Sequence, residues 1–130
     1  MMSTQPKIII VDDDPASLAL VKAALSQGHY EDVDAFINPI EAQKSYREKQ
    51  YDILITDLRM PVLSGFDILA DIKDINTDKP AVIVLTAQAE ANSENRALEM
   101  GAKKVFFKPY KVAELLQEVG GLLAAKPSWY

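Results

Sequence analysis

The chain has 130 residues, 48% of them hydrophobic and 25% charged, which is typical of one globular domain with a proper core. Its net charge of −5 argues against direct nucleic-acid binding, which needs clustered lysines and arginines, and no apolar run approaches the ~20 residues that span a bilayer. Because cysteine is absent, disulfides, a thiolate nucleophile and a cysteine-based metal site are excluded, and we expect a cytoplasmic protein that binds no membrane.

The first half of the chain alternates predicted strands and helices. Residues 8–11 form a continuous β-branched run, which predicts a buried strand. Apolar residues then recur at helical spacing over residues 15–27, and Pro15 suits the first position of that helix. A second strand is predicted over residues 32–37, and Asn38-Pro39 begins a second helix that ends near residue 49.

The second half repeats the pattern. The apolar run Ile53–Ile55 predicts a third strand that leads to Asp57, and a helix with apolar residues up to Ile75 follows Gly65. A strand at residues 81–85, a weakly patterned helix within 90–100 with mainly Ala97 and Leu98 to pack, and a strand at 105–107 come next. The last helix has an apolar face that includes Val112 and Val119, and Gly120-Gly121 weakens its C-terminal part. Strands that alternate with helices in this way predict right-handed crossovers and a parallel sheet covered on both faces.

Chemically distinctive side chains stand where four of these strands end. Asp12 and Asp13 follow the first strand, Asp57 the third, Thr86 the fourth and Lys108 the fifth. The carboxyl ends of parallel strands lie along one edge of the sheet, where α/β proteins bind ligands. We therefore expect these residues to converge in one cleft.

Three carboxylates in one cleft need a cation. At ~4 Å and an effective dielectric near 20, each close pair of charges repels by about 4 kcal/mol. Oxygen ligands without histidine or cysteine favour a hard ion, and Mg²⁺ is the leading candidate where phosphate chemistry is involved. The sequence therefore predicts a Mg²⁺ site at Asp12, Asp13 and Asp57.

The other two groups suit phosphoryl transfer. A lysine ammonium such as that of Lys108 stabilises charge on a transferred phosphoryl group, and a hydroxyl such as that of Thr86 binds one of its oxygens. Asp57 is then the nucleophile, because carboxylates form aspartyl-phosphate intermediates. The sequence predicts that Asp57 is covalently phosphorylated.

Four segments resemble the response-regulator receiver domain of two-component signalling: IIIVDDDP at 8–15, ILITDLRMPVLSG at 53–65, VIVLTA at 82–87 and GAKKVFFKP at 101–109. The resemblance implies a flavodoxin-like three-layer α/β sandwich with five helices and a five-stranded parallel sheet of order 2-1-3-4-5, an order that comes from the family and not from the residues. It also implies one receiver domain over residues 1–130, with a core of about 6–125 and a tail or linker start at 126–130.

The resemblance assigns roles at the cleft. Asp57 receives a phosphoryl group from a phosphohistidine on a partner histidine kinase or phosphotransfer protein. Asp13, Asp57 and the main-chain carbonyl of Arg59 bind Mg²⁺ directly, and Asp12 acts through water. Lys108 and Thr86 contact the phosphoryl group.

The resemblance also implies how the signal is passed on, and here the chain departs from the family. Phosphorylation changes the surface of the fourth helix, fifth strand and last helix, usually through an aromatic residue three positions before the lysine, where this chain has Val105. Arg59 and Gln88 border the path of attacking water and set the lifetime of the aspartyl phosphate. The bond before Pro109 is expected to be cis.

Two other functions fit parts of the pattern. A haloacid-dehalogenase-like phosphohydrolase also uses strand-end aspartates, threonine, lysine and Mg²⁺, and Asp12-x-Asp14 is similar to its D-x-D start; Ala16 and the lack of an acidic pair after Lys108 argue against it. A receiver-like binding module without regulated phosphorylation is the other alternative, because Val105 replaces the usual aromatic. The downstream partner is not indicated by the sequence.

Overall fold

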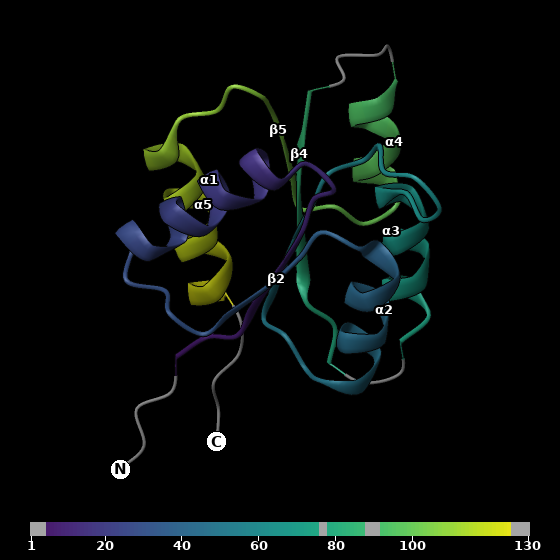
Figure 1. Cartoon of the computed structure of the whole chain (residues 1–130), viewed down its shortest axis with the longest axis horizontal. Coiled ribbons are helices and arrows are strands. Elements are labelled where there is room, and N and C mark those ends of the chain that lie inside the picture. Colours follow the sequence, from purple (N-terminus) through teal and green to yellow (C-terminus); the bar gives the residue numbers. More distant parts are fainter. Residues whose placement is uncertain (1–4, 76–77, 88–91, 126–130) are drawn as a thin grey trace.

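The computed structural model describes residues 5–75, 78–87 and 92–125, which form a five-stranded parallel sheet between two layers of helices (Figure 1). The strands are β1 (Ile8–Val11), β2 (Val33–Phe36), β3 (Ile53–Thr56), β4 (Ala81–Thr86) and β5 (Lys104–Phe107). Their order, β2-β1-β3-β4-β5 with every pair parallel, confirms the predicted topology.

In the described part of the chain, five helices cover the sheet. They are α1 (Pro15–Gln27), α2 (Pro39–Glu48), α3 (Gly65–Lys73), α4 (Ser93–Glu99) and α5 (Val112–Ala125). Figure 1 shows α1 and α5 on one face and α2, α3 and α4 on the other. Within the described ranges, no helix combines the length and the apolar character that crossing a bilayer requires.

The central strands are apolar because both of their faces are covered. In β1, Ile8 and Ile10 pack in the cluster under α1 and α5, whereas Ile9 and Val11 pack in the cluster under α2, α3 and α4. Side chains of a strand alternate between faces, so a strand buried on both sides reads as a continuous hydrophobic run. This explains why the strands at residues 8–11 and 53–56 were predictable from sequence.

Side-chain caps fix where the helices begin. Asp14 accepts a hydrogen bond from the amide of Ala16, and Asn38 accepts one from the amide of Ile40, so each caps its helix at the N-terminus. Ser64 and Asp67 form a reciprocal capping box at the start of α3. Such a cap is worth about 1 kcal/mol, and that of Asp14 lies directly after Asp12 and Asp13.

Two helices differ from the prediction. Helix α3 ends at Lys73, so Ile75 lies beyond the helix, although its side chain still packs against the core. In α4, Ala97 is buried but Leu98 is 41% exposed, because this short helix presents only a narrow stripe to the sheet. Helix α5, in contrast, continues past the two glycines that were expected to weaken it and ends at Ala125, since packing of its apolar face overrides the weak helix propensity of glycine.

A polar network joins α2 to α3. Asp71 accepts hydrogen bonds from Tyr46 at 2.7 Å, from Gln43 at 3.3 Å and from Arg47 through two guanidinium nitrogens at 2.8 and 3.1 Å. Burial and the bond to Asp71 raise the pKa of Tyr46. Burial alone raises the pKa of Asp71, but its hydrogen bonds, that from Arg47 first, lower it overall. The network fixes the helix layer that supports β3.

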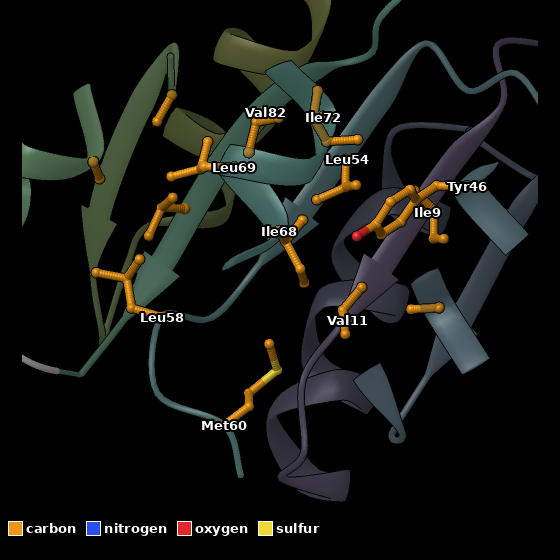
Figure 2. Packing of buried hydrophobic residues seen from close by; sticks show 14 of the residues in the cluster. Ile9, Val11, Tyr46, Leu54, Leu58, Met60, Ile68, Leu69, Ile72 and Val82 are labelled. Carbon is orange, nitrogen blue, oxygen red and sulfur yellow. The ribbon is translucent and has the colours of Figure 1, made fainter. Parts of the chain in front are cut away.

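The loop between β3 and α3 is anchored in the core on one side and strained on the other. Leu58 and Met60 point into the cluster beneath α3 (Figure 2) and are 2% and 8% exposed. Val62, in contrast, is 86% exposed and has φ +75°. A β-branched residue is strongly disfavoured in this left-handed region.

Replacing Val62 with glycine is therefore expected to stabilise the protein by about 0.5–1 kcal/mol. Glycine removes a strain of roughly 1–2 kcal/mol, and the greater freedom of glycine in the unfolded chain offsets part of that gain. Urea denaturation measures the difference. Val62→Ala keeps the Cβ and is the matched control, with a smaller gain; a lower stability of Val62→Gly would show that the valine side chain makes stabilising contacts.

Candidate functional site

Main-chain hydrogen bonds of the sheet continue one residue beyond the strands and position the predicted site residues. The amide after each strand end donates to a carbonyl of the neighbouring strand. The bonds are Asp12 N to Phe36 O at 3.1 Å, Asp57 N to Val11 O at 3.2 Å and Lys108 N to Thr86 O at 2.9 Å. The functional side chains therefore start from rigid backbone at one edge of the sheet.

Three carboxylates meet at this edge, as predicted. Asp12, Asp13 and Asp57 each offer an oxygen atom, and these atoms all lie within 4.8 Å of one another. Asp12 is buried, and Asp57 is half-buried. A cluster of hard oxygen donors, partly open to solvent, fits Mg²⁺, which keeps several waters and takes one or two carboxylates.

Lys108 supplies the positive charge within the cluster. Its Nζ lies 2.9 Å from Oδ2 of Asp12 and 3.3 Å from Oδ2 of Asp57. Burial lowers the pKa of Lys108, but the hydrogen bond to Asp12 and the charges of both carboxylates outweigh it and raise the pKa overall. The ammonium is therefore charged at neutral pH and offsets only one of three negative charges, which leaves the site attractive to a cation.

Contacts from its own strand and loop orient Asp57. The amide of Leu58 donates to Oδ1 at 2.7 Å, so Oδ2 is the oxygen that faces Lys108. The hydroxyl of Thr56, which is buried, donates to the main-chain carbonyl of Asp57 at 2.8 Å. Sequence reasoning missed Thr56, because a β-branched residue at a strand end carries no sign that its hydroxyl is used.

Gly65 closes the loop behind Asp57. Its amide donates to the carbonyl of Leu58 at 2.8 Å. A Cβ at this position would collide with the carbonyl oxygen of Asp57 and lie 2.8 Å from the Cα of Leu58. The residue stood in the predicted motif, but its requirement for close backbone approach is visible only in the structure.

Thr86 and Val105 lie where the strand pattern placed them. Thr86 is fully buried at the end of β4. Its neighbour in register is Phe107, and Val84 pairs with Val105. Val105 is buried in the cluster under α4, on the face where a relay to α4 would have to act.

Three further residues were expected to tune the site or its switch: Arg59, Pro109 and Gln88. Arg59 is exposed, directly after the buried Leu58. The Lys108–Pro109 bond is cis, which confirms that prediction. Gln88 lies outside the described residues.

The comparisons with known proteins point in one direction. A family model described as the response regulator receiver domain matches residues 8–120. The transcriptional regulatory protein PrrA of Mycobacterium tuberculosis is 33% identical over 125 residues, covering 96% of this chain and 53% of the relative. A probable chemotaxis protein CheY of Rhizobium etli is 29% identical over 120 residues, covering 92% of this chain and 93% of the relative. This chain thus spans about half the length of PrrA.

Solved structures agree. The receiver domain of the sensor histidine kinase PA1611 from Pseudomonas aeruginosa, determined with a magnesium ion coordinated in its active-site cleft, has a TM-score of 0.83 at 27% identity, covering 94% of this chain and 100% of that one. The BeF3-activated receiver domain of DrrB has a TM-score of 0.83 at 28% identity, covering 93% and 99%.

Proposed function

Because the chain belongs to the response regulator receiver domain family, we propose that Asp57 is its phosphoacceptor in a two-component or phosphorelay system. The observation that carries this proposal is the convergence of two further carboxylates and the ammonium of Lys108, 3.3 Å away, on the carboxylate of Asp57. Family membership also decides against a haloacid-dehalogenase-like phosphohydrolase: a receiver is not an enzyme that turns over an external ester.

The chemistry follows from the groups present. An oxygen of Asp57 attacks phosphorus, the bond from phosphorus to the donor nitrogen breaks, and the leaving imidazole keeps the electron pair. Lys108 stabilises charge on the phosphoryl oxygens, and Thr86 donates a hydrogen bond to one of them. The Leu58 amide, 2.7 Å from Oδ1, keeps the carboxylate aimed while this happens.

Mg²⁺ is the proposed metal. A relative in the same family is described with magnesium in its cleft, and the oxygen donors of this chain suit the ion. We assign Asp13, Asp57 and the main-chain carbonyl of Arg59 as direct ligands and Asp12 as a ligand through water. When bound, Mg²⁺ neutralises charge that builds up on the transferred phosphoryl group.

The phosphodonor is a phosphohistidine on a partner kinase or phosphotransfer protein. The single histidine of this chain, His29, follows the far end of α1, whose 13 residues span about 20 Å from the site. Near the site, α1 is apolar on its outer face as well, where Leu20 is 66% exposed and Ala16 and Ala19 are also exposed. This surface suits the helix of a partner.

The output is proposed to be a changed surface of α4, β5 and α5. This surface presents Leu98 and Phe107, which are 41% and 37% exposed. Because Val105 has no aromatic ring to swing, the change is proposed to begin at Thr86 and to reach α4 by another route. Arg59 and Gln88 are proposed to tune the lifetime of the phosphoryl group. The extent of the domain, about 6–125, and a cytoplasmic location stay predictions; residues 126–130 lie outside the described residues.

The test is stoichiometric phosphorylation. We expect one phosphoryl group per chain when the protein is incubated with MgCl₂ and acetyl phosphate, and none without the metal, as measured by intact-protein mass spectrometry. Asp57→Asn keeps the shape of the side chain but removes the nucleophile, so its mass should not change. A phosphoryl group retained by Asp57→Asn would refute the assignment, and continuous release of phosphate from an ester would favour the hydrolase.

A further inference from the structure

A cavity of about 530 Å³ lies at the end of the sheet opposite to Asp57. Ala81, the first residue of β4, lines it and pairs in register with Ile53, the first residue of β3. The six residues of β4 span about 20 Å, so the cavity is separate from the carboxylate cluster. Small-molecule sites typically have volumes of about 300–1,000 Å³, and this cavity is therefore of a size to hold a small ligand.

The inner wall of the cavity is apolar. Leu69 and Ile72 of α3 and Val82 of β4 are buried, lie close together (Figure 2) and form part of this wall. Leu122 of α5, which packs with the cluster on the other face of the sheet, lines it as well. Such a wall favours an aliphatic or aromatic body, because removing apolar surface from water is favourable.

The rim of this cavity is positively charged, although the whole chain carries a net charge of −5. Its described lining includes the exposed lysines Lys73, Lys79 and Lys103 and a single acid, Glu99. Lys79 is engaged at the end of α3, where its Nζ donates to the carbonyl of Lys73 at 2.6 Å. Within the described ranges, the side chains of Lys73 and Lys103 form no ion pair, so their ammonium groups are available to an anion.

The main chain holds Lys103 at this rim. Its amide donates to the carbonyl of Val82 at 2.8 Å, and the amide of Ala102 donates to that of Ala97 at 3.0 Å. These bonds fix the turn between α4 and β5, so the lysine side chain starts from ordered backbone beside the apolar wall. Lysine stems pack along apolar surface while their charged ends stay in water. An anionic head can therefore be bound at the rim without being buried.

We propose that this cavity binds a small amphipathic carboxylate. Its apolar body lies against the wall formed by α3, β4 and α5, and Lys73 and Lys103 bind its carboxylate. Glu99 beside the lysines disfavours a polyanion, so a single negative charge fits best. The inference does not depend on phosphorylation, since Asp57, Thr86 and Lys108 are not part of the lining.

The experiment titrates the ¹⁵N-labelled protein with octanoate and follows the amide chemical shifts by NMR. We expect shifts centred on Ala81, Gly101 and Lys103, which line the cavity, and little change at Asp57. The shifts should approach saturation by about 10 mM, as a ligand of millimolar affinity requires. Octanol and octylammonium carry the same chain with a neutral or a positive head. They should bind about fivefold more weakly or worse, the upper range for an exposed charge pair.

Variants of the two lysines test the recognition of the head group. Lys73→Gln and Lys103→Gln should each weaken octanoate binding by about threefold to fivefold and leave octanol binding unchanged. Lys103→Arg, which keeps the charge, should retain most of the affinity. Lys44→Gln, which removes an exposed charge on α2, is the matched control and should alter neither affinity.

The neutral ligand separates the possible outcomes. Selective loss of octanoate binding in the lysine variants, with octanol binding retained, supports the proposal and shows that the variants are folded. Octanol that binds as tightly as octanoate overturns it, because the cavity would then recognise only an apolar chain. Octanoate shifts that are absent or centred on another face overturn it as well. So do shifts at the cavity that follow protein concentration without ligand, which would mean that a second copy covers it.

Discussion

Lys108→Met is expected to slow phosphorylation of Asp57 by about 100-fold and to destabilise the protein by about 2 kcal/mol in the absence of Mg²⁺. The rate falls because removing one preorganised charge donor from a transition state costs about 10²–10³. Stability falls because the substitution removes the ammonium, which in the wild type lies 2.9 Å from Asp12 and 3.3 Å from Asp57. Without it, a buried carboxylate is left beside like charges, which is costly.

Magnesium and pH distinguish this cause from a simple packing defect. Saturating MgCl₂ should restore most of the stability of Lys108→Met, since the ion replaces the missing positive charge, but should not restore the rate. The folded-state pKa of Lys108 is raised, so its stabilising effect is complete below the unfolded lysine pKa of about 10.4 and is lost as pH rises through the folded value. The difference from wild type should therefore persist at neutral pH and shrink only in strong alkali.

Urea denaturation with and without MgCl₂ measures these effects, and Lys111→Met is the matched control. Lys111 is an exposed lysine shortly after Lys108, so its replacement should change stability by less than about 0.5 kcal/mol. A variant Lys108→Met that is as stable as wild type without metal would mean that the carboxylates do not need the ammonium.

The sheet and its functional edge could be predicted because both follow from patterns within single segments. Continuous β-branched runs identify strands covered on two sides, as at Ile8–Val11 and Ile53–Thr56. The parallel order then brings the residue after each strand to one edge. That is why Asp12, Asp57 and Lys108 could be assembled without coordinates.

The side-chain contacts between segments could not be predicted, because no pattern in either segment indicates which residues of the other it will touch. The ring of Phe66 and the guanidinium of Arg96 meet although 30 positions separate them in sequence, and neither position is distinctive in its own helix. The hydroxyl of Thr56 reaches the carbonyl of Asp57 only because the chain turns there. Helix ends also escaped prediction: Ile75 continues the apolar spacing of α3 but lies outside it, because Asp74 already caps the helix at its C-terminus.

Gly65→Ala is expected to destabilise the protein by about 3 kcal/mol, although alanine normally stabilises a helix relative to glycine. Gly65 is the first residue of α3, and its missing Cβ leaves room for the backbone of Asp57 and Leu58. Backbone atoms cannot move aside as a flexible side chain can, so the loop must open, at a cost at the upper end for overpacking. The displaced Asp57 should also be phosphorylated more slowly.

The matched control for Gly65→Ala is Gly121→Ala, which should have the opposite sign. Gly121 lies inside α5, and an added Cβ would meet no atom within 4 Å. Alanine there should gain about 0.5–1 kcal/mol from helix propensity and from the reduced freedom of the unfolded chain. Thermal and urea denaturation of both variants compare the two positions directly. If Gly65→Ala is as stable as Gly121→Ala, the loop yields without cost and Gly65 does not position the phosphoacceptor; if it is destabilised while its phosphorylation rate is unchanged, Gly65 serves the fold alone.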